Sequence, residues 1–495
     1  MSAKAKSSGG GWAAYIRSAR EGGLILDDAP NAELHTRLRA LPSVERLLEQ
    51  PEVQALQAAH GREPVVAGAR ACLDAARTAL RRHPGAEVPA LAELSLAIDA
   101  RLARAARPVL HPLINATGIV LHTNLGRAPL ASAAAEAAAA VASGYSNLEF
   151  DLEAGRRGAR TQGVEPLLCE ITGAEAALAV NNAAAAVLLA LSALASGGEV
   201  VVSRGELVEI GGGFRIPDVI TQGGAKLVEV GTTNRTRSSD YASAITPATR
   251  VLLKVHPSNY RMLGFTGEAG LEQLAALARE RGLILMHDLG GGALVDLRAM
   301  GLPHEPTVQE SLAAGADLVA FSGDKLMGGP QAGLLVGRAA VLEPLRRHPL
   351  LRAVRLDKMT LAALEATLQL YRDPARAAQT VPVLAMLDQT VAALQARAER
   401  LGALLDASSP HRNDWRVEPS EAFTGGGTLP TQGRESRALV WTSESGAELT
   451  ARRLRTGAPA VVGRVRDGAL VFDMLTVSDA ELDGLAGALE QVRRS

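Results

Sequence analysis

Several features that would assign this 495-residue chain to a common class of proteins are scarce or missing. It has two cysteines, Cys72 and Cys169, which are too few for a disulfide framework, so we expect a reducing compartment. No apolar run reaches the roughly 18 residues of a membrane span. The first residues also lack the apolar core of a secretory signal. We therefore expect a cytoplasmic protein with a disordered tail over residues 1–12.

An excess of charge of one sign is missing as well. The chain has 52 Lys and Arg residues against 53 Asp and Glu residues, so its formal net charge is −1. This balance excludes nucleic-acid binding by the charge of the whole surface, and any such binding needs a local basic patch. Aromatic residues make up only 3% of the chain, so Ala, Leu and Val must build the core. The length predicts two or three domains.

The first 110 residues have the apolar spacing of helices and no strand-like alternation. We predict an N-terminal helical domain over residues 13–110. In its last helix Arg101, Arg104 and Arg107 recur every three residues, so they share roughly one side. They form either a phosphate-facing patch or an ordinary solvated helix face, and the sequence leaves both open.

From residue 113 on, short apolar runs alternate with segments of helical length, such as 182–195 and 269–281. This alternation predicts an α/β fold with a mostly parallel sheet covered by helices. We assign the large domain to residues 111–375 and a small α/β domain to residues 376–495. The predicted strands of the large domain are 200–202, 226–230, 251–255, 283–286, 318–321 and 334–336.

One stretch of the predicted large domain, residues 317–337, has the pattern of strand, lysine on a turn, and strand. A lysine between two buried strands is costly unless it has a partner. An aldehyde cofactor that forms a Schiff base with the amine of Lys325 would be such a partner. The alternative is a lysine at the mouth of a loop whose charge stays in water.

Two further strand ends favour the cofactor. Asn182 precedes a long Ala/Leu helix, whose amino end could cradle a phosphate, and Ser322 could bind the same phosphate. Asp288 follows the strand at 283–286 and could hold a proton on a pyridine nitrogen. Each feature is also compatible with a plain cap or turn. Taken in chain order, Asn182, Asp288 and Lys325 predict a pyridoxal-phosphate domain.

Other chemistries fit less well. Ser322-x-x-Lys325 matches the Ser-x-x-Lys motif of penicillin-recognising enzymes, but the Ser-Asp-Asn and Lys-Thr-Gly partners of that motif are missing from the sequence. The sequence also lacks metal-binding spacing of His and Cys and a phosphate-binding loop of the Gly-x-x-x-x-Gly-Lys type. Arg127, Arg352 and Arg355 would bind a polyanion if they converged, whereas surface ion pairing is the commoner role of arginine.

Eight segments together resemble bacterial selenocysteine synthase, the L-seryl-tRNA(Sec) selenium transferase family. The resemblance runs from about residue 35 to the end. The segments are 115–130, 145–149, 203–212, 231–234, 255–260, 287–292, 322–333 and 357–360, which read NATGIVLHTNLGRAPL, YSNLE, SRGELVEIGG, GTTN, VHPSNY, HDLGGG, SGDKLMGGPQAG and DKMT.

The resemblance implies an aspartate-aminotransferase-type, fold type I, pyridoxal 5'-phosphate enzyme. It implies that Lys325 carries the cofactor and that Asp288 faces the pyridine nitrogen. The family's selenophosphate-binding arginines match Arg127, Arg352 and Arg355. The N-terminal domain would bind tRNA, with Arg101, Arg104 and Arg107 as candidates, and the family forms rings of ten subunits built from dimers.

The implied reaction converts L-seryl-tRNA(Sec) to L-selenocysteinyl-tRNA(Sec). Serine would lose its hydroxyl by β-elimination to an aminoacrylyl intermediate, and selenium from selenophosphate would add, with Lys325 as the base. Two alternatives stay open at this point. One is a pyridoxal-phosphate ammonia-lyase that acts on a small amino sugar acid and lacks a long N-terminal domain. The other is an RNA-binding scaffold with an inactive core.

Overall fold

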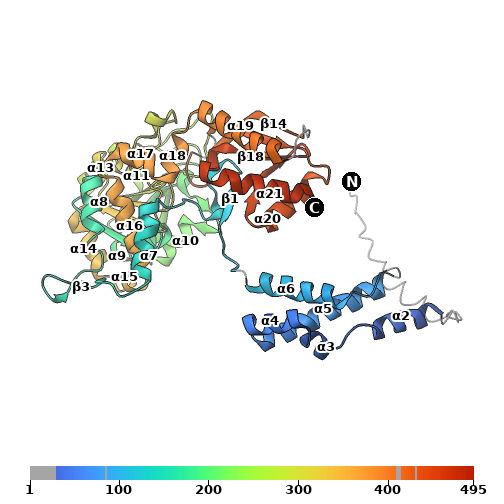
Figure 1. Ribbon diagram of the computed structural model, residues 1–495. Helices are drawn as coiled ribbons and strands as arrows, with labels where there is room; N and C mark the ends of the chain where they lie inside the picture. The colour runs from blue at the N-terminus through green and yellow to red at the C-terminus, as the bar shows by residue number, and fades with distance from the viewer. Residues whose placement is uncertain (1–28, 84–85, 107, 409–413, 430–431, 495) are drawn as a thin grey trace, which may run out of the picture. The chain divides into compact units, whose positions relative to one another are not determined.

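The computed structural model describes residues 29–83, 86–106, 108–408, 414–429 and 432–494. The tail that we predicted as disordered, residues 1–12, lies outside them. The chain divides into two compact units, residues 1–111 and 112–495 (Figure 1). Each unit has hydrophobic clusters of its own.

The N-terminal unit is helical, as its apolar spacing predicts. Its helices are α2 (Ala29–Arg39), α3 (Val44–Leu48), α4 (Pro51–His60), α5 (Arg62–Arg82) and α6 (Leu91–Ala106). On α6 the buried residues Leu94, Ile98 and Leu102 recur every four positions and face α5, which buries Val65 and Leu73. This spacing places one apolar stripe of each helix in the common core.

A seven-stranded sheet organises the second unit. Its strands in spatial order are β5 (Ala176–Val180), β13 (Gly333–Gly337), β12 (Leu318–Ser322), β11 (Ile284–Gly290), β10 (Thr249–Val255), β6 (Glu199–Ser203) and β9 (Lys226–Val230). All pairs are parallel except those of β13, which is antiparallel to both β12 and β5. The carboxyl ends of β5, β11 and β12 therefore lie at the same edge of the sheet.

Helices cover both faces of this sheet, so its strands are apolar on both sides. On β5, Leu178 and Val180 face one helical layer, whereas Ala177 and Ala179 face the other. The first layer includes α9 (Ala183–Leu194), α10 (Ile216–Gln222) and α14 (Ala339–Arg347). The second includes α8 (Glu165–Thr172), α12 (Leu271–Arg281), α13 (Val308–Ala313) and α16 (Lys358–Leu370), and α16 packs along α7 (Ser132–Ala142).

The other elements up to residue 387, apart from the strands β1 and β2, are short. They are the helices α11 (Ser238–Ala244), α15 (Leu350–Ala353), α17 (Pro374–Thr380) and α18 (Pro382–Leu387), the 3-10 turns η1 (Thr123–Leu125), η2 (Arg204–Glu206) and η3 (Leu297–Met300), and the strand pairs β3 (Phe150–Asp151) with β4 (Arg156–Arg157) and β7 (Glu209–Ile210) with β8 (Phe214–Arg215).

A second sheet combines both ends of the second unit. Its strands in spatial order are β17 (Arg464–Arg466), β18 (Ala469–Asp473), β15 (Gly433–Trp441), β14 (Trp415–Gly425) and β2 (Ile119–Leu121). In addition, β1 (Leu113–Asn115) pairs with β16 (Ala460–Val462). The helices of this part are α19 (Val391–Ser408), α20 (Ala447–Thr456) and α21 (Leu482–Arg494), with η4 (Met474–Thr476) and η5 (Asp479–Glu481). The strands β1 and β2 thus tie residues 113–121 to the C-terminal part of the chain.

The predicted strands of the large domain are all present, with one boundary that was wrong. We predicted a strand over 283–286 with Asp288 just beyond it, but β11 continues to Gly290. The strand is longer because Asp288 still pairs with Ala320 of β12 and Gly290 with Phe321. Asp288 therefore lies within the sheet. Among the described residues, no helix has the length and apolar character that crossing a membrane requires.

Candidate functional site

Lys325 lies in the connection between β12 and β13. The alternative of a lysine at a loop mouth with its charge in water does not hold, because only 6% of Lys325 is exposed. The loop folds back on the sheet: Gly323 donates a backbone hydrogen bond to Ala332, and Leu326 donates one to Gly291. A Cβ added at Gly427 would lie 2.5 Å from Nζ of Lys325, so the Gly427 backbone closes over the amine.

The surroundings of the Lys325 amine disfavour its charged form. Burial lowers its pKa from the ordinary value, and the positive charge of Arg127 lowers it further. The carboxylates of Asp288, Asp324 and Glu305 act in the opposite direction but do not reverse the shift. A lysine that can lose its proton is a candidate base or nucleophile.

Asp288 lies close to Lys325. A Cβ at Gly290, two residues after Asp288, would lie 3.8 Å from Nζ of Lys325. Burial raises the pKa of Asp288 to about 6, against the opposing effects of Lys325 and of the Gly290 backbone N–H group. Its backbone is held on both sides, by Ala320 of β12 and by Val255 of β10. The carboxyl group is thus fixed in a buried place where it can hold or release one proton near neutral pH.

Asn182 and Ser322 are both neighbours of Gly333. Asn182 caps α9 and accepts a hydrogen bond from the Ala185 N–H group at 2.8 Å. Ser322 is buried and pairs with Gly333, and a Cβ at Gly333 would lie only 2.0 Å from the carbonyl oxygen of Asn182. The amino end of α9 and the end of β12 are therefore neighbours. Free N–H groups at a helix amino end are suited to a phosphate.

The three predicted anion-binding arginines differ in their placement. Arg127 has a left-handed backbone (φ 62°), and its Nη1 lies 2.7 Å from Oδ2 of Asp324, the neighbour of Lys325. Arg355 bridges to Val180 at the end of β5, and its Nη1 lies 3.4 Å from Oε1 of Glu149. Arg352 lies exposed on α15, one turn before Arg355. Arg127 thus contacts the loop that carries Lys325, and Arg355 contacts the end of β5. Arg352 is linked to this region only by its position three residues before Arg355.

The predicted tRNA-binding arginines belong to the other unit. Arg101 and Arg104 are exposed on α6, whereas Leu102 between them points into the core. Arg107 lies outside the described residues. The two arginines are therefore available to solvent on one helix face.

Two residues at the site were not predicted. Glu305 is buried, its Oε1 lies 3.3 Å from Nε2 of His256, and its charge acts on Lys325. His256 follows β10, and its backbone N–H group donates to the carbonyl of Asp288 at 2.9 Å. Glu305 precedes α13 in an irregular segment, so no periodicity marks it. For His256 the signal was its position directly after a predicted strand.

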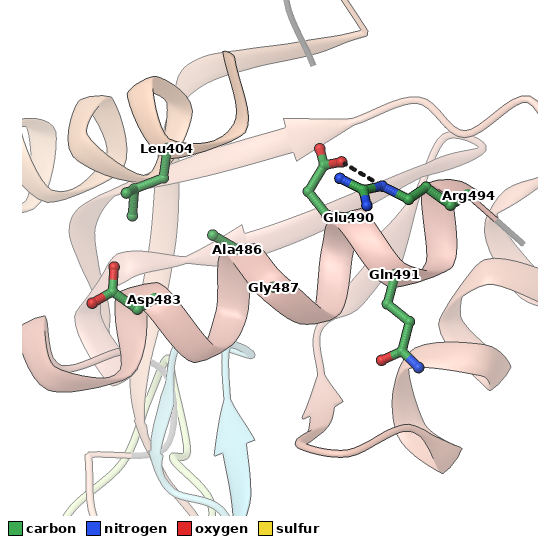
Figure 2. A pocket seen from close by; sticks show the side chains of 7 residues that line it. All are labelled: Leu404, Asp483, Ala486, Gly487, Glu490, Gln491 and Arg494. Carbon is green, nitrogen blue, oxygen red and sulfur yellow. Dashed lines mark ion pairs between the residues drawn. The ribbon is translucent and has the colours of Figure 1, made fainter. Parts of the chain in front are cut away.

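Cavities adjoin the site at His256 and Glu305 and at Gly427. One of about 310 Å³ is lined by residues that include His122, Phe423 and Gly427, and one of about 390 Å³ by residues that include His256 and Glu305. A further cavity, of about 520 Å³, lies over α19 and α21, where Leu404, Asp483 and Arg494 line it (Figure 2). None of the predicted site residues lines this last cavity, so it is not the candidate site.

Comparison with known families gives two matches. The family model described as L-seryl-tRNA selenium transferase matches residues 113–478. The model described as selenocysteine synthase N terminal matches residues 38–77. The two matches cover most of the chain and fall in the two structural units.

Curated relatives agree. The chain is 49% identical over 461 residues to an L-seryl-tRNA(Sec) selenium transferase of Geobacter sulfurreducens, which covers 91% of this chain and 98% of the relative. It is 49% identical over 458 residues to one of Hyphomonas neptunium (92% and 98%) and 48% identical over 460 residues to one of Moorella thermoacetica (93% and 97%).

Among solved structures, a D-glucosaminate-6-phosphate ammonia-lyase superposes with a TM-score of 0.55 at 22% identity, covering 80% of this chain and 98% of the other. This likeness shows a shared fold. The prediction of an α/β fold of the aspartate-aminotransferase type, fold type I, with an N-terminal helical region, is confirmed.

Proposed function

The chain belongs to the L-seryl-tRNA selenium transferase family, and on this premise we propose that it converts L-seryl-tRNA(Sec) to L-selenocysteinyl-tRNA(Sec) with selenium from selenophosphate. The observation that carries the proposal is the buried Lys325 beside Asp288 at the edge of the sheet. The chain that contains this pair is 49% identical to a named transferase. The name of those relatives states the reaction, and the geometry supports Lys325 and Asp288 as candidate residues for it.

The residues present fit pyridoxal 5'-phosphate as the cofactor. Lys325 would hold the aldehyde carbon through its amine, and Asp288 would face the ring nitrogen. The amino end of α9 at Asn182, together with Ser322, would bind the phosphate. When bound, this cofactor supplies a sink for the electrons that remain at Cα after a proton leaves. The chemistry of these residues matches the groups of the cofactor. An amine of lowered pKa, a buried carboxyl and a helix amino end lie at one edge of the sheet.

Each residue then has a definite task. Lys325 takes the proton from Cα of the seryl group, because burial and Arg127 favour its neutral amine. Asp288, with a pKa of about 6, is mostly ionised at neutral pH and can hold a proton on the ring nitrogen. Arg127, Arg352 and Arg355 would bind the selenophosphate anion, and Asp324 would orient Arg127 through their 2.7 Å ion pair.

The remaining parts of the proposal concern partners and assembly. The N-terminal unit would bind the tRNA, with Arg101 and Arg104 of α6 facing its phosphates. The protein would act in the cytoplasm as a ring of ten subunits built from dimers. Large apolar side chains that are exposed in the second unit support such an assembly, among them Tyr145, Leu152, Leu263 and Phe265.

The deciding experiment compares two activities of the purified protein. One assay follows selenium transfer from selenophosphate to seryl-tRNA(Sec), and the other follows ammonia release from D-glucosaminate 6-phosphate. We expect the first and not the second. Ammonia release without selenium transfer would replace the proposal with the lyase alternative. Binding of tRNA without either activity would favour an RNA-binding scaffold.

A further inference from the structure

The cavity of about 310 Å³ beside Lys325 has a definite construction. β14 and β2 run parallel, with Phe423 opposite Ile119 and Gly425 opposite Leu121. The loops that follow the two strands carry His122 and Thr123 on one side and Gly426 and Gly427 on the other. The cavity therefore opens at the carboxyl ends of a parallel pair, and Asn259 from the segment after β10 completes it.

This cavity and the reactive amine have Gly427 as a common neighbour. Gly427 lines it, and the same Gly427 lies so close to Lys325 that an added Cβ would be 2.5 Å from Nζ and 2.9 Å from Cε. A group bound in the cavity would therefore lie one residue, Gly427, away from Lys325.

The lining favours a neutral, flat ligand over an anion. No Lys, Arg, Asp or Glu lines this cavity among the described residues. Ile119, Leu121 and the half-buried ring of Phe423 provide apolar surface, and the glycines expose backbone. Thr123 and Asn259 are exposed and place a hydroxyl and an amide beside that surface. Nucleobases bind proteins by stacking on such aromatic rings.

We propose that this cavity binds the terminal nucleoside of the aminoacyl-tRNA, with its base stacked on Phe423. The seryl ester on the ribose then extends past Gly427 to Lys325. This inference rests on the proposed function, because it takes seryl-tRNA as the substrate. The arginines would hold the anionic selenium donor, and the cavity, which has no Lys, Arg, Asp or Glu among its described lining residues, would hold the nucleoside.

The test uses the cofactor-loaded protein and a stable mimic, serine joined by an amide bond to 3'-amino-3'-deoxyadenosine. Phe423→Leu keeps apolar bulk but removes the aromatic face, and Phe423→Tyr keeps the face. We expect Phe423→Leu to weaken binding of the mimic roughly tenfold, the order of one lost base stack. Phe423→Tyr should bind nearly as the parent protein does. Val465→Ala, at an exposed position on β17 of the same sheet, is the matched control.

A second measurement separates stacking from a general disturbance of the site. Serinamide lacks the nucleoside, so its binding should be the same in Phe423→Leu and the parent. Calorimetry with the cofactor-free protein should show the same loss for the mimic, and inorganic phosphate should not displace it. Equal binding of the mimic by Phe423→Leu and the parent would overturn the inference, as would an equal loss for serinamide. Failure of the parent protein to transfer selenium to seryl-tRNA would instead contradict the proposed function.

Discussion

At the scale of single residues, burial decides the chemistry of this site. Lys325 and Asp288 are both buried, and burial is the first cause of both pKa shifts. The lysine amine is moved toward its neutral form, and so is the aspartate carboxyl. Burial thus disfavours the charged form of two groups that would both be charged in water at neutral pH.

The first prediction concerns Lys325. Lys325→Ala removes the amine that we propose as the base for the Cα proton, and we expect turnover to fall by at least about 10²-fold. Mass spectrometry after borohydride reduction should find the cofactor attached to a peptide containing Lys325 in the parent and to no peptide in the variant. Lys226→Ala, on β9, removes a lysine whose side chain is 74% exposed and serves as the control. Undiminished turnover of Lys325→Ala would contradict the assignment of Lys325 as the base.

The second prediction concerns the pH dependence set by Asp288. Its pKa rises from 3.8 to about 6 on folding, so the folded state holds this proton more tightly. The resulting stabilisation is complete below pH 3.8 and is lost as the pH rises through about 6. Between pH 5 and 7.5 it should fall by about 1.4 kcal/mol. The amide of Asp288→Asn does not titrate in this range, so this variant lacks the effect.

Denaturant unfolding of the cofactor-free parent and of Asp288→Asn, at a series of pH values, measures this effect. As the pH rises, the unfolding free energy of the parent should fall relative to that of Asp288→Asn. A difference that stays constant from pH 5 to 7.5 would show that the Asp288 carboxyl is not perturbed by folding.

At the scale of elements, the site depends on how closely the hairpin of β12 and β13 packs on the start of α9. Gly333 joins them: it pairs with Ser322 and Val180, and a Cβ there would lie 2.0 Å from a backbone oxygen of Asn182. Backbone atoms of a buried strand and of a helix cap cannot move away as a flexible side chain can. This contact holds Ser322 and Asn182 in one group.

The third prediction follows from this contact. Gly333→Ala should destabilise the protein by about 1–3 kcal/mol, the usual cost of overpacking, and should lower cofactor affinity. Gly487→Ala is the matched control, because Gly487 lies on α21 with nothing within 4 Å of its added Cβ (Figure 2). There the change should stabilise the helix by up to about 1 kcal/mol. Thermal unfolding and cofactor titration of both variants provide the comparison. Equal stability of the two would contradict the packing argument.

At the scale of the whole molecule, the residues that we propose for tRNA binding and those that we propose for the chemistry belong to different units. The chain has a net charge of −1, so attraction of a polyanion must be local. Arg101 and Arg104 are exposed in the N-terminal unit, and Lys325 is buried in the second. Residues 38–77 of the first unit match the model described as selenocysteine synthase N terminal, and residues 113–478 match the model described as L-seryl-tRNA selenium transferase.

The fourth prediction tests this division. Arg101→Glu with Arg104→Glu should weaken tRNA binding roughly tenfold or more at low salt and make the salt dependence shallower. Deletion of residues 1–110 should abolish tight tRNA binding and leave the cofactor bound. Filter binding at matched salt and the cofactor absorbance measure the two properties. Arg347→Glu on α14, also an exposed arginine, is the control. Unchanged affinity in the double variant would remove α6 from the tRNA-binding surface.

The sequence by itself determined the class of fold and the order of its parts. Apolar runs of strand length mark β6, β10, β12 and β13, because burial on both sheet faces requires continuous apolar residues. The same local patterns indicated the N-cap at Asn182 and the lysine between two strands. These are properties of neighbouring residues, so a sequence can show them without a structure.

Only the tertiary structure decided what surrounds those residues. The burial of Lys325 depends on Gly427, about a hundred positions away, and its charged neighbours include Arg127 and Glu305. The continuation of β11 through Asp288 depends on pairing with β12. The cavity at Phe423 exists because β2 and β14 pair across some three hundred residues. Such contacts follow from the packing of distant segments, which no local spacing encodes.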